Sequence, residues 1–80
     1  MTVNTVRINF FGAFRKYGDY KMLHLPQDSS VLDLKRLLAE HLNDPLVWDS
    51  AIACNDTIVN YDYRVQIHEV ISILPPVCGG

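Results

Sequence analysis

The sequence predicts an α+β fold in which a mixed β-sheet packs against one main helix. Two strand-like segments open the chain, one amphipathic segment occupies its middle, and a nearly continuous apolar segment lies close to its end. The 80 residues are 49% hydrophobic and 20% charged, which is typical of one globular domain rather than of a disordered chain. We expect this domain to span residues 1–74 and a flexible tail to follow over residues 75–80.

The opening segments predict an N-terminal β-hairpin. Residues 5–11 alternate apolar and polar side chains and are rich in residues that favour strands. A turn around Gly18 leads into a second strand over residues 20–25, which ends before a proline. Phe11 falls on the face of the first strand that points away from the core. The core-facing residues of that strand are Val6, Ile8 and Phe10.

Residues 30–42 predict the main helix. Ser30 followed by Asp33 fits a capping box, in which the serine oxygen accepts a hydrogen bond from an early backbone N–H. Pro45 disfavours helical geometry in the residue before it and so ends the segment. The core-facing residues at helical spacing are Val31, Leu34, Leu37, Leu38 and Leu42, and the residues expected on the opposite, solvent-facing side are Lys35, Arg36 and Glu40.

The remaining residues predict short strands. Residues 51–54 and 57–59 flank a tight turn at Asn55 and Asp56. Residues 69–74 are nearly all apolar, which favours a central strand covered on both faces. The resulting order of elements matches the β-grasp, or ubiquitin-like, arrangement, with the first and last strands side by side at the centre of the sheet.

Charge and composition exclude several classes of function. The net charge is −2 and the seven basic residues are scattered, whereas nucleic-acid-binding proteins usually concentrate them in one stripe. The N-terminus lacks the pattern of a signal peptide, and no apolar run approaches the roughly 20 residues that span a bilayer. The two cysteines have no metal-ligand spacing. We therefore expect a cytoplasmic protein that binds no nucleic acid, membrane or metal.

The chain shows no pattern typical of an active site. Gly12 and Gly18 stand alone and form no phosphate-binding loop, and Cys54 is expected to fill a small apolar site. The histidines are isolated from one another: His24, His41 and His68. We expect that the chain is not an enzyme by itself and that it binds no cofactor.

The final stretch, LPPVCGG, is unusual for a small domain. Pro75 and Pro76 restrict the backbone to extended geometry and carry the chain outward, with a reach of about 20 Å from Pro75 to Gly80. Glycines lack Cβ atoms and so fit a narrow channel in another protein. The carboxyl carbon of Gly80 is also sterically open. The stretch predicts a tethered group that is activated and attacked inside a partner.

These residues carry a resemblance to a known family. Residues 54–80, CNDTIVNYDYRVQIHEVISILPPVCGG, resemble the C-terminal third of the small subunit of molybdopterin synthase, the MoaD family. Residues 8–18, INFFGAFRKYG, are similar to the opening strand of that family, with its Phe-Phe pair. Two departures stand out: residues 66–69 replace a turn that is often Asp-Gly-Asp-Glu, and Cys78 replaces a small residue such as serine or threonine.

The resemblance implies a sulfur carrier that acts with partners. A ubiquitin-activating-like enzyme would adenylate Gly80 with ATP, and the acyl-adenylate would be converted to a thiocarboxylate. A larger catalytic subunit of molybdopterin synthase would then draw in the tail and use the sulfur to build the dithiolene of molybdopterin. The chain itself would bind no cofactor, since ATP is used by the activating enzyme. Gly79 would let the tail pass through the partner's channel.

The remaining predicted site residues belong to the tail and to a docking surface. The tail residues before the glycines are Pro75, Pro76, Val77 and Cys78. Phe11, as an exposed aromatic residue on the sheet, and Phe14, in the turn region that follows, are predicted to contact the partner. The resemblance adds Arg15, which matches an arginine that family members commonly carry near the partner.

Three alternatives stay open. Within the same chemistry, the chain could carry sulfur for thiazole synthesis or tRNA thiolation. It could instead be a ubiquitin-like protein modifier that forms isopeptide bonds with lysines. As a purely non-covalent binding module, it would function without Gly79 and Gly80.

Overall fold

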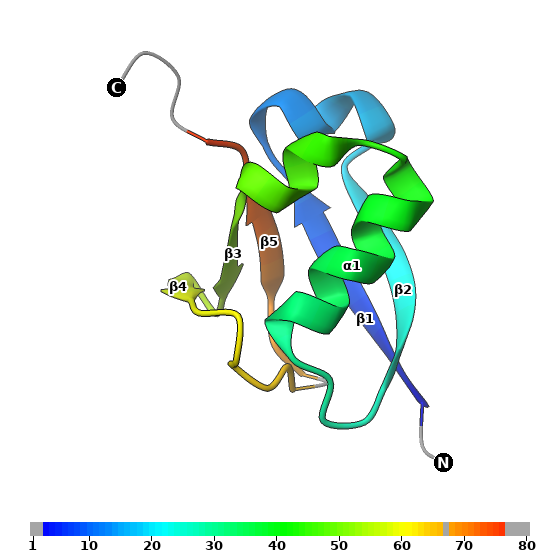
Figure 1. Ribbon diagram of the computed structural model, residues 1–80, viewed down its shortest axis with the longest axis vertical. Helices are drawn as coiled ribbons and strands as arrows, with labels where there is room; N and C mark the ends of the chain where they lie inside the picture. Colours follow the sequence, from blue (N-terminus) through cyan, green and yellow to red (C-terminus); the bar gives the residue numbers. More distant parts are fainter. Residues whose placement is uncertain (1–2, 67, 77–80) are drawn as a thin grey trace.

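The computed structural model describes residues 3–66 and 68–76. Within these residues, one α-helix lies across one face of a five-stranded sheet with strand order β2-β1-β5-β3-β4 (Figure 1). The elements are β1 (Val3–Phe10), the 3-10 helix η1 (Gly12–Tyr17), β2 (Tyr20–Pro26), α1 (Val31–Leu42), the 3-10 helix η2 (Pro45–Asp49), β3 (Ala51–Cys54), β4 (Thr57–Val59) and β5 (Ile71–Leu74). The predicted α+β class is confirmed.

The strand pairing defines the topology. β1 pairs with β2 in antiparallel register and with β5 in parallel register, with Ile8 opposite Ile71. β5 also pairs with β3 in antiparallel register, with Leu74 opposite Ala51. The first and last strands are therefore neighbours at the centre of the sheet, as Figure 1 shows, and the predicted β-grasp arrangement is confirmed.

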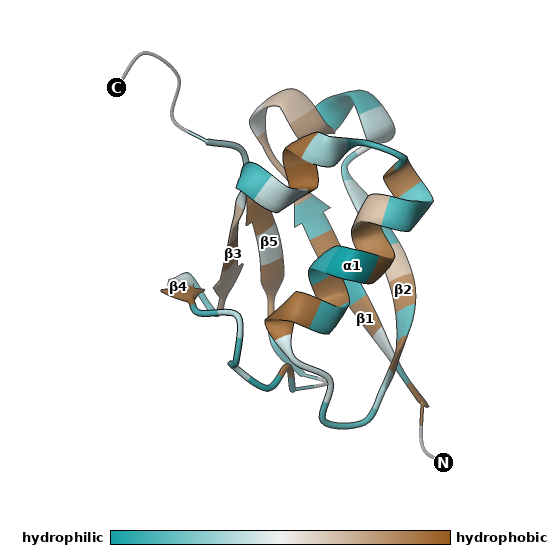
Figure 2. Cartoon of the chain, viewed as in Figure 1, coloured by the Kyte–Doolittle hydropathy of each residue, from teal (hydrophilic) through white to brown (hydrophobic). Residues whose placement is uncertain are grey.

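The core lies between α1 and the sheet. Figure 2 shows that apolar and polar residues alternate along α1, and the buried apolar residues of the helix belong to one core cluster with those of the sheet. Each fully buried leucine, isoleucine or phenylalanine contributes about 1.5–3 kcal/mol through the surface that it removes from water. The predicted core-facing residues that are buried are Val6, Ile8, Phe10, Val31, Leu34 and Leu38. Leu37 and Leu42 are partly buried against this core.

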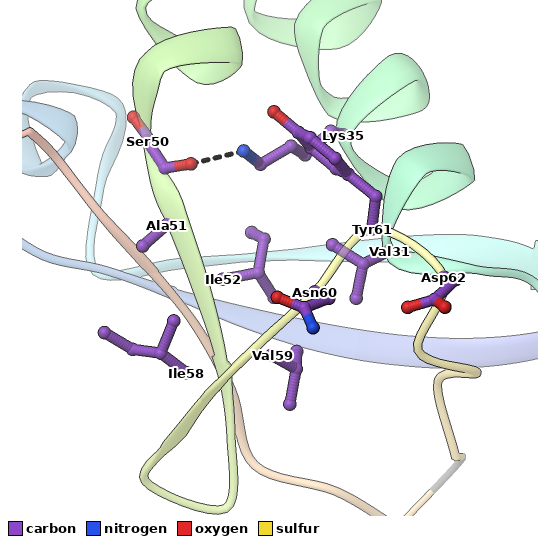
Figure 3. Close-up of a pocket in the computed structure, with 10 residues that line it drawn as sticks. All are labelled: Val31, Lys35, Ser50, Ala51, Ile52, Ile58, Val59, Asn60, Tyr61 and Asp62. Atoms are coloured by element: carbon purple, nitrogen blue, oxygen red, sulfur yellow. Dashed lines mark hydrogen bonds between the residues drawn. The ribbon is translucent and has the colours of Figure 1, made fainter.

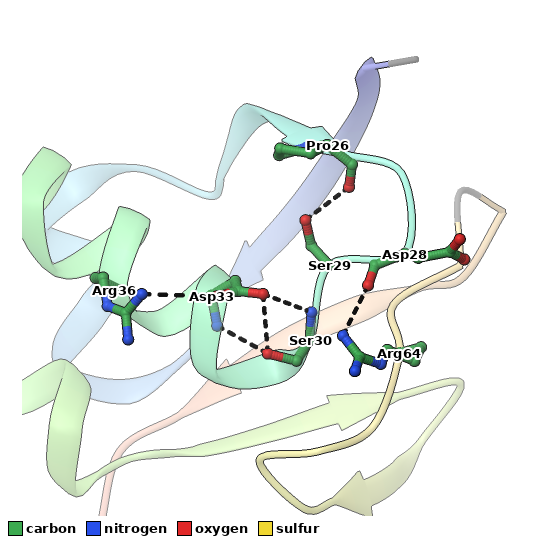
Figure 4. Close-up of polar contacts among 7 residues, drawn as sticks. All are labelled: Pro26, Asp28, Ser29, Ser30, Asp33, Arg36 and Arg64. Atoms are coloured by element: carbon green, nitrogen blue, oxygen red, sulfur yellow. Dashed lines mark hydrogen bonds and ion pairs between the residues drawn. The ribbon is translucent and has the colours of Figure 1, made fainter. Parts of the chain in front are cut away.

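The predicted capping box fixes the start of α1 (Figure 4). The backbone N–H of Asp33 donates to Ser30 Oγ at 3.2 Å, and the backbone N–H of Ser30 donates to the Asp33 carboxylate at 3.0 Å. The Ser30 hydroxyl also donates to this carboxylate at 3.1 Å, and the two bonds donated by Ser30, the backbone one foremost, hold the pKa of Asp33 below its ordinary value. At the other end Asn43 adopts left-handed geometry, with φ 51°, and closes the helix.

Replacing Ser30 by alanine should lower the free energy of unfolding by about 1 kcal/mol, because the Asp33 N–H loses its acceptor. Urea unfolding near neutral pH measures this change. Ser30→Thr is the matched control, since it retains a hydroxyl at the cap position. Equal unfolding midpoints for the alanine and threonine variants would show that the cap does not stabilise the helix.

Lys35 corrects the prediction of a solvent-facing lysine. Its side chain is buried, its ammonium donates a hydrogen bond to the backbone oxygen of Ser50, and it lies 4.8 Å from the centre of the Tyr61 ring (Figure 3). The backbone N–H groups of Val31 and Leu32 donate to the carbonyls of residues 63 and 61. These bonds hold the irregular segment after β4 against the first turn of the helix, so it covers the lysine.

Two further features differ from the prediction. The turn regions before β2 and before β3 form the 3-10 helices η1 and η2, which had no periodic signal in the sequence. β5 is central but is not covered on both faces, because α1 packs on one side only. Ile71 and Ile73 are buried against it, whereas Ser72 and Leu74 on the opposite face are half-buried.

Candidate functional site

The candidate site begins where the chain leaves the sheet. β5 ends at Leu74, and the ring of Pro75 lies against the backbone of Gly12, the first residue of η1. A Cβ atom at Gly12 would come within 2.6 Å of Pro75 Cγ, far below a normal contact distance. Gly12 also has φ +57°, a left-handed conformation that favours glycine. The base of the tail therefore rests on the bare backbone of Gly12.

Contacts at both ends hold η1 in place. Phe14 is fully buried, and its ring centroid lies 6.4 Å from that of Phe10. The hydroxyl of Tyr17 donates a 2.6 Å hydrogen bond to the Asp44 carboxylate, and the Lys16 ammonium lies 3.6 Å from the same carboxylate. These interactions, with the Tyr17 bond foremost, lower the pKa of Asp44. η1 is thus joined to the core and to the end of α1, and it forms a fixed support for the tail.

The predicted docking residues divide into two groups. Phe11 is 43% exposed and directly precedes Gly12, so it lies beside the base of the tail. Arg15 is exposed and pairs with Asp19 at 3.1 Å, an interaction that contributes little to stability at the surface. Phe14 was predicted to contact a partner, but this prediction is wrong, since the side chain is 0% exposed. The 3-10 geometry of η1 turns it inward to complete the core.

The tail residues are only partly described. Pro75 and Pro76 are half-buried. Val77, Cys78, Gly79 and Gly80 lie outside the described residues, so their predicted roles stay predictions. Sequence reasoning missed Gly12, whose only signal is a single glycine directly after a strand.

The face of the sheet opposite α1 is rich in exposed apolar groups. Strand alternation places Tyr20 and Met22 of β2 on this face, and Val70 lies just before β5 with 54% of its surface exposed. The Arg7 guanidinium packs over the Tyr20 ring at 3.9 Å. Because Phe11 continues the alternation of β1 in extended conformation, this open face reaches the base of the tail and fits the contact of a protein partner.

Two pockets lie elsewhere among the described residues, and polar groups in each of them are engaged in structural bonds. A pocket of about 510 Å³ between α1 and the segment after β4 includes Lys35, Ser50 and Tyr61, but the lysine ammonium bonds to the Ser50 carbonyl (Figure 3). A second, of about 480 Å³, lies beside the capping box and includes Arg36, which pairs with Asp33 at 3.7 Å. Within residues 3–66 and 68–76, no group of three His, Cys, Asp or Glu side chains could hold a metal ion. No helix of the described residues is long and apolar enough to cross a membrane.

Cys54 fills a buried position on β3, as predicted. Burial, and then the negative charge of Glu69, raise the pKa of its thiol from 9.0 to about 11. Glu69 also accepts a 2.5 Å hydrogen bond from the Tyr63 hydroxyl, which raises the pKa of Tyr63 to about 12. Since the thiolate is the nucleophile, Cys54 is poorly suited to chemistry near neutral pH.

We expect Cys54 to resist alkylation in the folded protein by at least about 100-fold relative to the unfolded chain at about pH 8, because both burial and the raised pKa suppress the thiolate. Iodoacetamide labelling with and without urea, read by peptide mass, checks this. Equal labelling rates in the two states would contradict the buried placement.

The raised pKa of Cys54 also means that the protonated thiol stabilises the fold fully below about pH 9, and that this contribution is lost as pH rises toward about 11.

Within the described residues, the strand order and the single packed helix place the domain in the ubiquitin-like, or β-grasp, class of folds. The ThiS family matches residues 8–80. The chain therefore belongs to the ThiS family. No curated protein sequence matches the chain significantly.

Solved structures share the fold. A Pyrococcus furiosus protein assigned as molybdopterin converting factor subunit 1 superposes with a TM-score of 0.76 at 24% identity, covering 92% of this chain and 99% of that one. SAMP1 from Haloferax volcanii superposes with a TM-score of 0.78 at 15% identity, covering 96% and 100%. A chain from the complex of subunits 1 and 2 of the molybdopterin-converting factor of Helicobacter pylori superposes with a TM-score of 0.59 at 28% identity, covering 95% and 99%.

Proposed function

We propose that this ThiS-family chain is the sulfur carrier subunit of a molybdopterin synthase and that a larger catalytic subunit is its partner. The observation that carries the proposal is the similarity, at 28% identity over 95% of this chain, to a chain of the two-subunit molybdopterin-converting factor complex. The Pro-Pro-Val-Cys-Gly-Gly ending supports it.

The proposed chemistry takes place at the carboxylate of Gly80. A carboxylate is a poor electrophile, so a ubiquitin-activating-like enzyme transfers AMP from ATP to the Gly80 carboxylate and releases pyrophosphate. A sulfur donor then attacks the acyl carbon, AMP leaves, and a thiocarboxylate remains. Tethering keeps the sulfur at a high local concentration in the partner's active site, so it does not diffuse as free sulfide.

The described surface suits this division of labour. The open face of the sheet, with Phe11 and Met22 exposed on it, offers apolar area to the large subunit beside the base of the tail. The partner would supply the active site. The carrier supplies the sulfur and the docking surface.

Intact mass tests the proposal directly. The protein is co-expressed with a ubiquitin-activating-like enzyme and a sulfur donor, and the terminal peptide is then isolated. Replacement of one oxygen by sulfur at Gly80 supports the proposal. Oxidation of Cys54 or Cys78 changes the mass almost equally, so the change must be localised to Gly80. An unmodified tail beside a demonstrably active activating enzyme would overturn it.

A carrier for another sulfur pathway is the second candidate, and the ThiS family match favours it. The loaded protein should then be tested with a molybdopterin synthase large subunit and its precursor. Formation of molybdopterin supports the first assignment. A thiocarboxylate that this pair does not consume supports the second, and adducts on cellular lysines would instead indicate a protein modifier.

A further inference from the structure

We infer that Gly12 is a positioning residue for the tail: its bare backbone forms the seat on which Pro75 rests, and this seat sets the direction in which the chain leaves the domain toward the activating enzyme. The inference rests on the proposed carrier function. It assigns to η1, and to the glycine at its start, a role beyond completing the turn between β1 and β2.

The contact is specific in two independent respects. A Cβ atom at Gly12 would lie 2.6 Å from Pro75 Cγ, 3.3 Å from Cδ and 3.9 Å from Cβ, so only the outer atoms of the proline ring conflict with it. The backbone at Gly12 has φ +57°, which costs an L-residue about 1 kcal/mol. The steric conflict involves Pro75 of the tail, whereas the backbone strain arises in η1 alone. Variants that remove only one of these two effects can therefore separate them.

Both sides of the contact are fixed by the fold. β5 is paired on one edge with β1 and on the other with β3, and Leu74 is opposite Ala51. β5 thus holds the chain up to Leu74, and the ring of Pro75 fixes φ at the next residue. On the other side, the burial of Phe14 and the bond from Tyr17 to Asp44 hold η1. The contact of Pro75 with Gly12 therefore joins two supported segments at the point where the chain leaves the sheet.

Direction matters because the tail must be threaded into another protein's channel while the domain docks outside it. A misplacement of about 1 Å at a reacting group can cost about 100-fold in rate. A ring displaced at Pro75 changes the direction in which the backbone leaves β5. The seat should therefore affect the turnover of the docked complex more than the affinity of docking.

A double-mutant cycle tests the seat. Wild type, Gly12→Ala, Pro75→Ala and the double variant are assayed for ATP-dependent pyrophosphate release with the activating enzyme. We expect Gly12→Ala to lower kcat by about 10- to 100-fold, with KM for the carrier changed by no more than about twofold. In the Pro75→Ala background the same change should cost no more than about threefold, since the conflicting ring atoms are gone. Equal losses in the two backgrounds would overturn the inference.

Gly18→Ala is the matched control for strain in η1. Gly18 has φ +119°, so alanine is strained there too, but the nearest atom to its Cβ is the Tyr20 carbonyl oxygen at 3.9 Å, away from the tail. We expect a loss of stability and an unchanged kcat at a temperature where every variant is folded. A fall in kcat matching that of Gly12→Ala would assign the effect to strain and overturn the seat.

A second measurement is independent of the enzyme. In a Cys54→Ala background, a nitroxide on Cys78 broadens the amide signals of the domain near which the tail lies. We expect Gly12→Ala to change this broadening pattern when Pro75 is present and to leave it unchanged in a Pro75→Ala background. That pair of results in a carrier that is never adenylated would support the seat while refuting the proposed function. An unchanged pattern would overturn the seat itself.

Discussion

Deletion of Gly80 abolishes sulfur loading and leaves the domain folded: this is the largest functional effect that we expect. Removing one residue withdraws the terminal carboxylate by about 3.3–3.6 Å, and a displacement of that size at a reacting group should cost at least about 100-fold in rate. Among the described residues the buried core extends no further along the chain than Ile73, so we expect the free energy of unfolding to stay unchanged. Mass of the terminal peptide and urea unfolding check the two halves of this prediction.

A length-matched control separates reach from shape. Gly80→Ala keeps the carboxylate at the same distance but adds a Cβ atom beside it, so it tests whether the channel needs a bare backbone. We expect partial loading of this variant, between wild type and the deletion. Normal loading of the Gly80 deletion would mean that loading does not depend on the position of the terminal carboxylate, and the carrier proposal would fail.

Most of the fold could be predicted from local patterns in the sequence. The capping box of Ser30 and Asp33 and the leucine stripe after it depend on residues three or four apart, so the helix could be predicted within its own segment. The apolar run that contains β5 predicted its central place for a similar reason. The lack of a covering layer on the second face of β5 could not be predicted, because the number of layers packed on a sheet depends on the whole chain.

Lys35 shows where local reasoning ends. Its position on the helical wheel predicted a side chain exposed to solvent. The helical periodicity that underlies this prediction is correct for α1. The lysine is buried because residues 61 and 63 accept hydrogen bonds from the first turn of α1 and bring the Tyr61 ring over its ammonium. The segment that contains residues 61 and 63 has no regular periodicity, so the sequence does not indicate where it packs.

The seat of the tail illustrates the same limit at the candidate site. The tail itself was conspicuous, because two prolines followed closely by two glycines at the end of a chain are chemically suggestive. Gly12 is remote from Pro75 in sequence, and only the parallel pairing of β1 with β5 brings the two together. A contact of that kind follows from topology rather than from any motif.

Phe11 and Phe14 lie close together in the sequence, but Phe14 is buried and Phe11 is exposed, so their substitution by alanine should have different effects. Phe14→Ala should lower the free energy of unfolding by about 3–5 kcal/mol, because a fully buried ring in contact with Phe10 is replaced by a cavity. A chain of this length has a total stability of only about 4–12 kcal/mol, so a substantial fraction could unfold at physiological temperature. Urea unfolding measures the change, and Phe14→Leu, which keeps most of the buried apolar surface, should cost less.

Phe11→Ala should behave in the opposite way. Its side chain is exposed, so stability should change by no more than about 0.5 kcal/mol. Binding to the large subunit should weaken by about 1–3 kcal/mol if the ring anchors that contact, as measured by titration calorimetry. A variant that binds normally would remove Phe11 from the interface, and a variant that unfolds would contradict its exposed placement. The two substitutions therefore separate packing of the core, at Phe14, from docking of the partner, at Phe11.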